Sequence, residues 1–190
     1  MNRTKIINSI INKYQYKTYL EIGCAGNRNF KRIKLEDKIG VDPRRGGTIR
    51  KTSDDFFKDN NKIFDIIFID GLHHSDQVYR DIINSLNFLK INGTIVVHDC
   101  NPVDHRAQII PRPSNQKQWN GDVWKAWAKL RCERDDLEMF VIDADHGCGI
   151  IRIGKQEKLN KIISDFHEFE LNKSEILNLK TIEYFTKWLT

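Results

Sequence analysis

The chain has 190 residues, of which 39% are hydrophobic and 30% charged, a composition typical of one globular domain with a hydrophobic core rather than a membrane-spanning protein. It has no apolar run of about 18 residues and no signal-peptide core at the N-terminus, so we expect a cytoplasmic protein. The net charge of +5 is spread along the sequence and the four cysteines stand singly, which argues against a basic nucleic-acid stripe, a disulfide framework and a zinc knuckle.

The N-terminal part of the chain predicts a helix, a strand and a glycine-rich turn. Isoleucines recur at helical spacing within Lys5–Tyr16, which indicates an amphipathic helix that covers a sheet. Thr18–Gly23 is typical of a buried strand, and Gly23–Gly26 breaks it before a short predicted helix over Asn27–Leu35. A turn of this kind brings backbone N–H groups close to a ligand, and a helix N-terminus adds its dipole.

An acidic residue ends the next predicted strand, Lys38–Pro43. Asp42 follows Glu21 by 21 residues, and at the end of this strand its carboxylate would accept hydrogen bonds from a ribose diol. Thr48–Thr52 predicts a weak third strand, and Ser53–Phe57 begins a helix or turn.

The stretch 64–102 predicts a β-α-β unit. Phe64–Asp70 is a short β-branched run typical of a strand in a parallel sheet. Ser75 can cap the helix that follows, and Asn92–Gly93 would end it. Thr94–Val97 predicts the second strand. Both strands are followed by polar side chains that can bind a metal. Because ligands of open α/β sheets sit at the carboxyl ends of the strands, we expect the functional site there.

The remaining part of the chain predicts a loop, a helix, two closing strands and a tail. Val103–Asn120 has no periodicity and predicts a loop over the carboxyl edge of the sheet. A helix is predicted over 121–131, closing strands over Glu138–Asp143 and Cys148–Ile153, and amphipathic helix over 156–190. No linker or repeat divides the sequence, so we expect a single domain over 1–190 with its core at about 18–153.

Four motifs occur in a recognisable order: Leu20–Gly26 (LEIGCAG), Gly40–Pro43 (GVDP), Phe68–His73 (FIDGLH) and Gly93–Asp99 (GTIVVHD). Together they resemble the class I S-adenosylmethionine (SAM)-dependent methyltransferases. They are most similar to small-molecule and sugar O-methyltransferases with an I-D-G-x-H motif followed by an H-D or D-D pair. The resemblance covers about residues 18–153 and implies a Rossmann-like α/β fold: a seven-stranded, mostly parallel sheet of order 3-2-1-4-5-7-6 with helices on both faces.

The resemblance also implies a SAM site. Its predicted residues are Glu21, Gly23 and Gly26 at the methionine part, Asp42 at the ribose hydroxyls, Ser53 and Asp54 beside the adenine, and Asp70 as a further contact. The chain departs from the family after Gly26, where Asn27-Arg28-Asn29-Phe30 replaces another glycine or a small hydroxyl pair. In the alternative, the acidic residues only finish strands and the glycines only turn the chain.

The predicted chemical half of the site consists of Asp70, His73, His98 and Asp99. Methyl transfer is an in-line displacement, so an enzyme must hold the acceptor oxygen about 3 Å from the methyl group and help it lose its proton. A divalent cation can lower the pKa of the hydroxyl, and a neutral histidine can accept the proton. The two carboxylates end strands about 4.8 Å apart, close enough to share one ion.

The resemblance implies that Asp70, His98 and Asp99 bind the metal. We expect Asp70, Asp99 and His73 to take part in catalysis, with His73 as the general base. His98 stands where some of the resembled enzymes place another aspartate, and Cys100 where others place an asparagine. One fewer hard oxygen ligand makes Mn²⁺ a candidate beside Mg²⁺. In the alternative, Asp70 only caps a helix and His98 is a satisfied interior histidine.

Three other functions stay open. A nicotinamide-dependent oxidoreductase shares the opening β-α-β, but only Gly23 and Gly26 stand where G-x-G-x-x-G is expected. A nucleic-acid methyltransferase fits the charge, but Asn101–Asp104 lacks the aromatic residue that stacks on a flipped base. A non-catalytic subunit with the same fold is the third. We expect a small-molecule or sugar acceptor and neither a membrane nor a nucleic-acid partner, and we leave a homodimer open.

Overall fold

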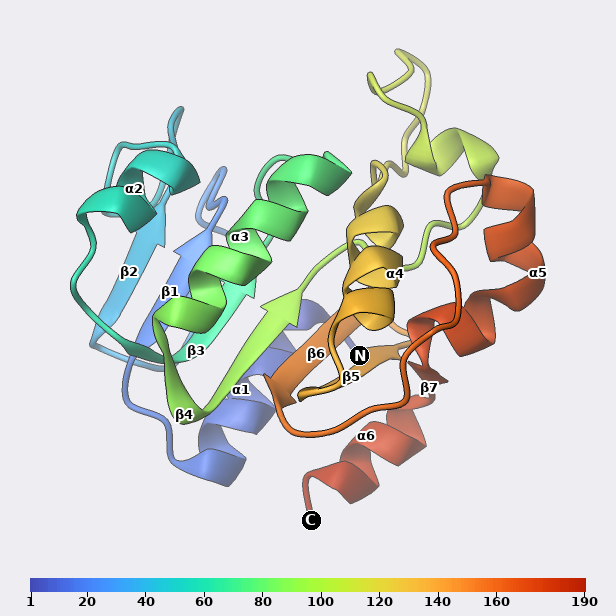
Figure 1. Ribbon diagram of the computed structural model, residues 1–190. Helices are drawn as coiled ribbons and strands as arrows, with labels where there is room; N and C mark the ends of the chain where they lie inside the picture. Colours follow the sequence, from blue (N-terminus) through green and yellow to red (C-terminus); the bar gives the residue numbers. More distant parts are fainter.

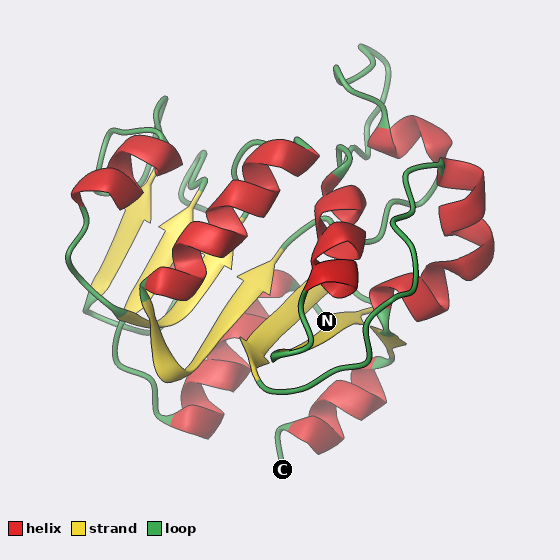
Figure 2. Ribbon diagram, viewed as in Figure 1, coloured by secondary structure: helices red, strands yellow, loops and turns green.

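In the computed structural model, which describes residues 1–190, seven strands form one sheet with helices on both of its faces (Figure 1; Figure 2). The strands are β1 (Tyr19–Ile22), β2 (Lys38–Val41), β3 (Phe64–Ile69), β4 (Leu89–Val97), β5 (Leu137–Ile142), β6 (Cys148–Ile153) and β7 (Leu179–Lys180). The α-helices are α1 (Arg3–Tyr14), α2 (Ser53–Asp59), α3 (Ser75–Asn87), α4 (Val123–Glu133), α5 (Phe166–Leu177) and α6 (Ile182–Trp188). Two short 3₁₀ helices, η1 (Phe30–Arg32) and η2 (His105–Gln108), complete the elements.

The strand order is β2-β1-β3-β4-β6-β5-β7. Strands β2, β1, β3 and β4 are parallel, whereas β6 is antiparallel to both of its neighbours, β4 and β5. As predicted, β1 lies beside β3, with Ile22 opposite Ile69. The predicted fold class, a mostly parallel Rossmann-like sheet with a final antiparallel pair, is therefore confirmed.

The predicted strand order is wrong in one respect. Thr48–Thr52 does not form a third strand, since only Ile49 makes a single bridge to β2. The cause is local: the Asp42 side chain accepts hydrogen bonds from the backbone N–H groups of Arg44 (2.8 Å) and Arg45 (2.9 Å), which folds the segment after β2 into a turn. The seventh strand is instead β7, which pairs with β5 at the opposite edge.

Three further local predictions are wrong. The segment 27–35 forms only the 3₁₀ turn η1, because Asn27 has a φ of +61°, which is incompatible with the start of an α-helix. The tail 156–190 contains β7 between α5 and α6 and is not wholly helical. Gly93 does not end a helix, because α3 already ends at Asn87 and Gly93 lies within β4.

The predicted helix cap is also wrong. His74 precedes α3 as its N-cap residue, and Ser75 is the first residue of the helix. The backbone N–H of Ser75 donates to Oδ1 of Asp122 (2.7 Å), so a side chain from the start of α4 satisfies this helix end. The contact joins α3 to α4 at the carboxyl edge of the sheet.

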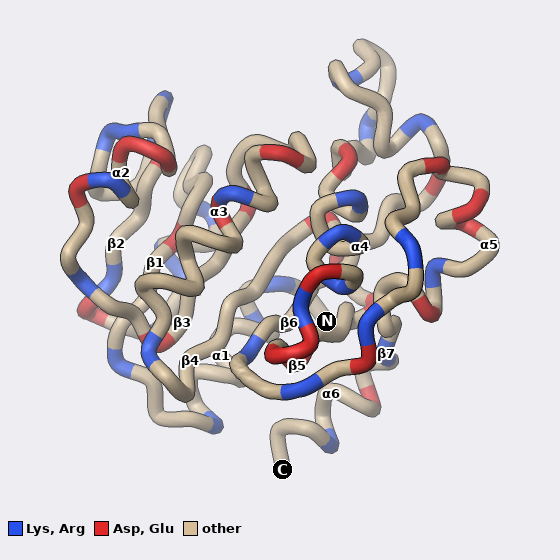
Figure 3. Tube along the Cα trace, viewed as in Figure 1, with Lys and Arg blue, Asp and Glu red and all other residues tan.

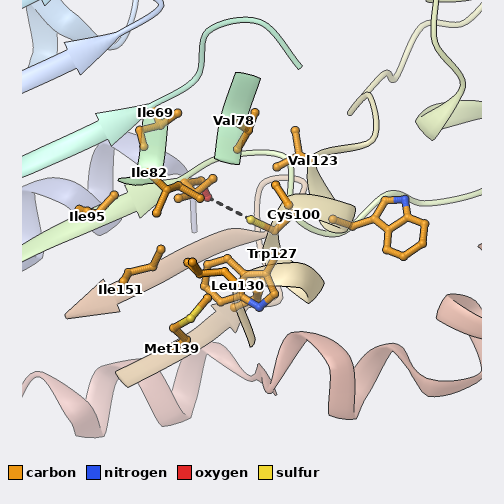
Figure 4. Packing of buried hydrophobic residues seen from close by; sticks show 14 of the residues in the cluster. Ile69, Val78, Ile82, Ile95, Cys100, Val123, Trp127, Leu130, Met139 and Ile151 are labelled. Atoms are coloured by element: carbon orange, nitrogen blue, oxygen red, sulfur yellow. Dashed lines mark hydrogen bonds between the residues drawn. The ribbon is translucent and has the colours of Figure 1, made fainter. Parts of the chain in front are cut away.

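Hydrophobic side chains form one cluster on each face of the sheet. The larger cluster lies between the sheet and α2, α3, α4 and α5, and the smaller one between the sheet and α1, η1 and α6. Figure 4 shows part of the larger cluster, where Ile69 and Ile95 of the sheet lie near Val78 of α3 and Trp127 of α4. Because the central strands are buried on both faces, only their ends are free for polar chemistry.

Charged residues of both signs are distributed over the helices and loops and are not gathered on one element (Figure 3). None of the helices combines the length and the apolar character needed to cross a membrane.

The loop over 103–120 rises at the end of the sheet toward which the arrowheads of β1, β3 and β4 point (Figure 1). The carboxyl edge of the parallel strands is therefore the end of the fold where a site is to be sought.

Candidate active site

Asp70, His98 and Asp99 come together because two parallel strands end side by side. Strand β3 ends at Ile69 and β4 at Val97, and these two residues are partners in the register of the pair. Asp70 and His98, which follow them, therefore leave the sheet at the same edge. Asp99 has a φ of +63°, an uncommon backbone conformation for a residue other than glycine, and this turn brings its carboxylate back to the same point.

Two imidazole rings lie between the two carboxylates. His73 has Nε2 at 3.4 Å from Oδ1 of Asp70 and Nδ1 at 3.3 Å from Oδ2 of Asp99. His98 has Nδ1 at 3.4 Å from Oδ1 of Asp70 and at 2.9 Å from Oδ2 of Asp99. The structure thus brings together the four residues predicted for the chemical half of the site.

Arg3 and Asp145 extend this group. Arg3 donates from Nη1 to Oδ2 of Asp70 (2.7 Å) and from Nε to Oδ2 of Asp145 (2.9 Å). The backbone N–H of Arg3 also donates to Oδ2 of Asp145 (2.7 Å), and this oxygen lies 3.8 Å from Nε2 of His98. We call the six residues the Asp–His cluster: Arg3, Asp70, His73, His98, Asp99 and Asp145.

Charges within the Asp–His cluster shift the pKa values of its members in complementary directions. Burial alone would raise the pKa of Asp70, but the two imidazoles hold it below its usual range. Burial alone would lower the pKa values of His73 and His98, but the carboxylates raise both, and that of His98 well above its ordinary value. His98 and Arg3 hold the pKa of Asp145 down. With protein groups alone, the cluster favours ionised carboxylates and protonated imidazoles.

The loop over 103–120 adds an aromatic wall. The ring of Trp119 stacks on that of His73, with centroids 5.0 Å apart and planes inclined by 9°. The indole N–H of Trp119 donates to the backbone oxygen of Ile109 (2.8 Å), and the Arg112 guanidinium lies 5.9 Å from the centroid of the Trp119 ring. The loop therefore reaches the carboxyl edge at His73 and fixes the plane of its imidazole.

One cavity of about 1280 Å³ contains the whole predicted site. Its lining includes every predicted SAM contact: Glu21, Gly23, Gly26, Asp42, Ser53, Asp54 and Asp70. The same lining includes the Asp–His cluster and Trp119. The cavity therefore joins the predicted cofactor end of the site to its predicted chemical end.

The glycine turn differs from the predicted one. The N–H of Gly23 donates to the backbone oxygen of Val41 (2.9 Å), so it is not free for a ligand. Gly23 has a φ of +85°, and a Cβ atom there would lie 2.2 Å from the backbone oxygen of Asp70, so the turn packs directly on the chain after β3. Since no α-helix follows, the expected helix dipole is missing. Gly26 has no atom within 4 Å of its Cβ position and leaves the cavity open there.

Asp42 is held by four backbone donors. Its Oδ2 accepts from the N–H groups of Cys24 (3.1 Å) and Ala25 (2.8 Å), and its Oδ1 from those of Arg44 (2.8 Å) and Arg45 (2.9 Å). Burial alone would raise the pKa of Asp42, but these N–H groups lower it. A carboxylate has about four lone-pair sites. Asp42 therefore fixes the turns after β1 and after β2 whatever else it binds.

Glu21 is a buried carboxyl group beside the glycine turn. Its Oε2 accepts hydrogen bonds from the Tyr19 hydroxyl and from Nδ2 of Asn29 (2.8 Å). Burial raises the pKa of Glu21 to about 7, although the hydrogen bonds from Tyr19 and Asn29 act in the opposite direction. A carboxyl group with this pKa would be stabilised in its ionised form by a positively charged ligand group nearby.

Asp81 of α3 lines the cavity near the residues predicted beside the adenine. Its Oδ1 accepts from Nε2 of Gln77 (3.0 Å), which also lies 3.1 Å from Oγ of Ser53 and 3.1 Å from Oδ1 of Asp54. Its Oδ2 is buried without a hydrogen-bond partner, and burial raises the pKa of Asp81 to about 6. Ser53 and Asp54 thus belong to a polar group that α3 completes.

Two sets of side chains could hold a metal ion. Asp70, His73 and Asp99 offer ligand atoms within 4.8 Å of one another, and so do His98, Asp145 and Cys148. Nδ1 of His73 and both ring nitrogens of His98 are buried, and their contacts with the neighbouring carboxylates lack hydrogen-bond geometry. Buried polar atoms in this state call for a further partner such as an ion. His98, the predicted ligand, belongs to the second set, although its Nδ1 also faces Asp70 and Asp99.

Sequence reasoning missed Arg3, Asp81, Trp119 and Asp145. Arg3 and Asp145 are 142 residues apart, and no local motif marks either of them. The link 144–147 contains turn-forming residues, which indicate a hairpin but not the direction of a side chain. An aromatic residue at the end of an otherwise irregular loop was the one signal available for Trp119.

Comparison with protein families gives one match. Residues 27–100, less than half of the chain, match the model of a family described as a methyltransferase domain. This segment begins directly after the glycine turn and ends at Cys100, the residue after Asp99. Comparison with curated proteins gave no match.

Solved methyltransferase structures have the same fold. The SAH-bound methyltransferase PaMTH1 of Podospora anserina is 18% identical, with a TM-score of 0.59 over 80% of this chain and 78% of that chain. TomG of Streptomyces achromogenes, an O-methyltransferase of tomaymycin synthesis in complex with SAM, is 13% identical, with a TM-score of 0.58 over 80% and 79%. An O-methyltransferase of Bacillus cereus in complex with SAH is 14% identical, with a TM-score of 0.51 over 80% of each chain.

At these identities the likeness shows the fold. The methyltransferase-domain match over residues 27–100 agrees with the predicted resemblance to methyltransferases.

The raised pKa of Asp81 predicts that the folded protein loses stability as the pH rises. Its pKa is about 6 in the folded state and 3.8 without the protein environment, so the folded chain binds more protons between these values and stability falls as the pH rises through them. Asp81→Asn cannot ionise. From pH 4 to pH 7 the free energy of unfolding of this variant, relative to wild type, should therefore rise by about 1–3 kcal/mol.

Urea denaturation at both pH values measures this difference. Asp76→Asn, at an exposed position of the same helix, is the matched control and should show no such change. A difference between Asp81→Asn and wild type that is independent of pH would contradict the account.

Proposed function

From the class I methyltransferase fold and the methyltransferase-domain match, we propose that the chain is a SAM-dependent O-methyltransferase that acts on a hydroxyl group of a small molecule, such as a sugar or a glycan. The observation that carries the proposal is the position of His73. Its two ring nitrogens face the carboxylates of Asp70 and Asp99 in the wall of the cavity. With the charge of these carboxylates offset by a bound cation, an imidazole in this position would be suited to take the proton of an acceptor hydroxyl.

The size of the cavity supports a reaction between two ligands. Pockets for one small molecule have volumes of about 300–1,000 Å³. The cavity here is larger, at about 1280 Å³, and extends from the glycine turn to Trp119. It therefore has room for SAM and for a small acceptor at the same time.

In the proposed arrangement SAM lies along the carboxyl edge. Glu21 binds the methionine ammonium group, because a positive charge there favours the ionised form of a carboxyl group whose pKa is about 7. Gly26 leaves space for the methionine part of the ligand. Asp42 lies at the ribose hydroxyls, and a hydroxyl there would share one of its oxygens with the two backbone N–H groups that this oxygen already binds. Ser53 and Asp54 lie beside the adenine, and Asp70 beside the sulfonium.

His73 must be neutral to accept a proton, whereas Asp70 and Asp99 favour its protonated form. When bound, a divalent cation such as Mg²⁺ or Mn²⁺ would polarise the acceptor hydroxyl and offset the charge of the carboxylates. The residues fit such an ion: Asp70 and Asp99 provide oxygens, and the buried, unpartnered Nδ1 of His98 faces both. This mixed set of oxygen and nitrogen ligands suits Mn²⁺ as well as Mg²⁺. His73 then accepts the proton while Trp119 holds its ring.

The proposed SAM site predicts the effect of Asp42→Ala. The variant should bind SAM more weakly by about 1–3 kcal/mol, because the ribose loses a charged acceptor and the glycine turn loses the acceptor of two N–H groups. Calorimetric titration with SAM, SAH and NAD measures this, with Glu36→Ala at an exposed position as the control. Unchanged affinity in a folded Asp42→Ala would reject the ribose assignment. Binding of NAD but not SAM by the wild type would favour an oxidoreductase.

The proposed metal site predicts that EDTA abolishes methyl transfer and that Mg²⁺ or Mn²⁺ restores it. Asp99→Asn should lower kcat at least tenfold and leave the affinity for SAM nearly unchanged, because Asp99 lies at the chemical end of the cavity. Mass spectrometry of acceptors incubated with SAM provides the assay. Full activity in EDTA would remove the metal from the mechanism and leave a histidine as the sole general base.

The proposed base predicts a change in pH dependence. His73→Ala should lower kcat and flatten the acidic limb of the pH–rate profile, since activity would no longer rise as an imidazole loses its proton. Mn²⁺ binding should persist, because His98 and the two carboxylates remain. His74→Ala is the matched control, as this neighbouring histidine does not line the cavity. An unaltered acidic limb in His73→Ala would assign the base elsewhere.

A further inference from the structure

The first helix supplies a positive charge to the chemical end of the cavity. Arg3, the first residue of α1, has a side chain that is 29% exposed and bonds to Asp70 at 2.7 Å and to Asp145 at 2.9 Å. Its backbone N–H holds the same Asp145 oxygen. No other lysine or arginine forms an ion pair with Asp70, Asp99 or Asp145.

The contact removes acceptor capacity from the residues that a metal ion would use. Oδ2 of Asp70 is occupied by the guanidinium, and only Oδ1 faces the two imidazoles. A carboxylate in this state can offer an ion one oxygen but not two. Asp145, which belongs to the second potential ligand set, is likewise held by Nε and by the backbone of Arg3.

Arg3 also changes the charge that an ion would meet. With both imidazoles neutral, as metal binding requires, Asp70, Asp99 and Asp145 together carry a charge of −3, and Arg3 reduces this to −2. A divalent cation at Asp70 and Asp99 would lie next to a guanidinium that contacts one of its own ligands. Two positive charges a few ångströms apart repel by several kcal/mol at an effective dielectric constant of about 20.

We propose that Arg3 is a built-in cation that competes with the divalent metal for Asp70 and keeps the metal loosely bound and exchangeable. This inference rests on the proposed metal site. Arg3 acts here as a positioning residue, because it touches the carboxylates and not the reacting atoms. The fork of its guanidinium sets Asp70 and Asp145 in place while its charge limits the affinity for the ion.

Mn²⁺ titration of the purified full-length protein tests this without an activity assay. Arg3→Gln should bind Mn²⁺ at least tenfold more tightly than wild type, because the amide can still donate to a carboxylate but carries no charge. Arg3→Lys keeps the charge and should stay within about threefold of wild type. Arg28→Gln is the matched control: Arg28 lines the same cavity, pairs with none of the three carboxylates, and should leave Mn²⁺ affinity unchanged.

Thermal unfolding gives a second readout. Mn²⁺ should raise the Tm of Arg3→Gln more than that of wild type, since an ion that binds the folded state more tightly stabilises it more. Unchanged or weaker Mn²⁺ binding by a folded Arg3→Gln, or equal gains in Arg3→Gln and Arg28→Gln, would overturn the role of Arg3. If wild type binds Mn²⁺ and Asp99→Asn does not, the metal site itself stands whatever Arg3 does. If neither wild type nor Arg3→Gln binds Mn²⁺, both ideas fall.

Discussion

The parallel pairing of β3 with β4 is the constraint on which the site depends. Ile69 and Val97 are partners at the ends of the two strands. The residues that follow them, Asp70 and His98, therefore leave the sheet side by side. The apolar residues before them are buried on both faces and fix this register, because a slip by one position would exchange the two faces of a strand. The geometry of the polar cluster is therefore a consequence of how the hydrophobic core packs.

Beyond the strand ends, the site depends on backbone conformations that cost energy. Asp99, Asp145 and His146 have φ values of +63°, +49° and +67°, and each such residue costs roughly 1–2 kcal/mol relative to an ordinary conformation. Neighbouring contacts offset this strain, since the backbone N–H groups of Cys100 and Asn101 donate to the turn that carries Asp145. The ion pairs that Arg3 and His98 form with Asp145 also offset this strain. Strain that is concentrated in one cluster and compensated there is typical of a functional site.

The sequence predicts the parts of this site that follow from local patterns. Strand ends, the glycine turn and an acidic residue after β2 are visible as short motifs, and the seven residues they assign to SAM all line one cavity. Arg3 and Asp145 carry no such pattern, because their pairing depends on how α1 and the β5–β6 link pack against the sheet. The same limit explains β7: two residues at an edge are held by β5 and not by their own propensity. Asn27, in turn, blocks a helix through a backbone angle that composition does not reveal.

Asp70 is the residue at which the separate parts of the fold meet. Its backbone oxygen is the atom that leaves no room for a side chain on Gly23, so the glycine turn packs on it directly. Its carboxylate lies against His73 and His98 on one side and against Arg3 on the other. A displacement of Arg3 would therefore change the electrostatic environment of both imidazoles through Asp70. The proposed cosubstrate site and the proposed chemical site therefore share Asp70, whose backbone contacts the first and whose carboxylate belongs to the second.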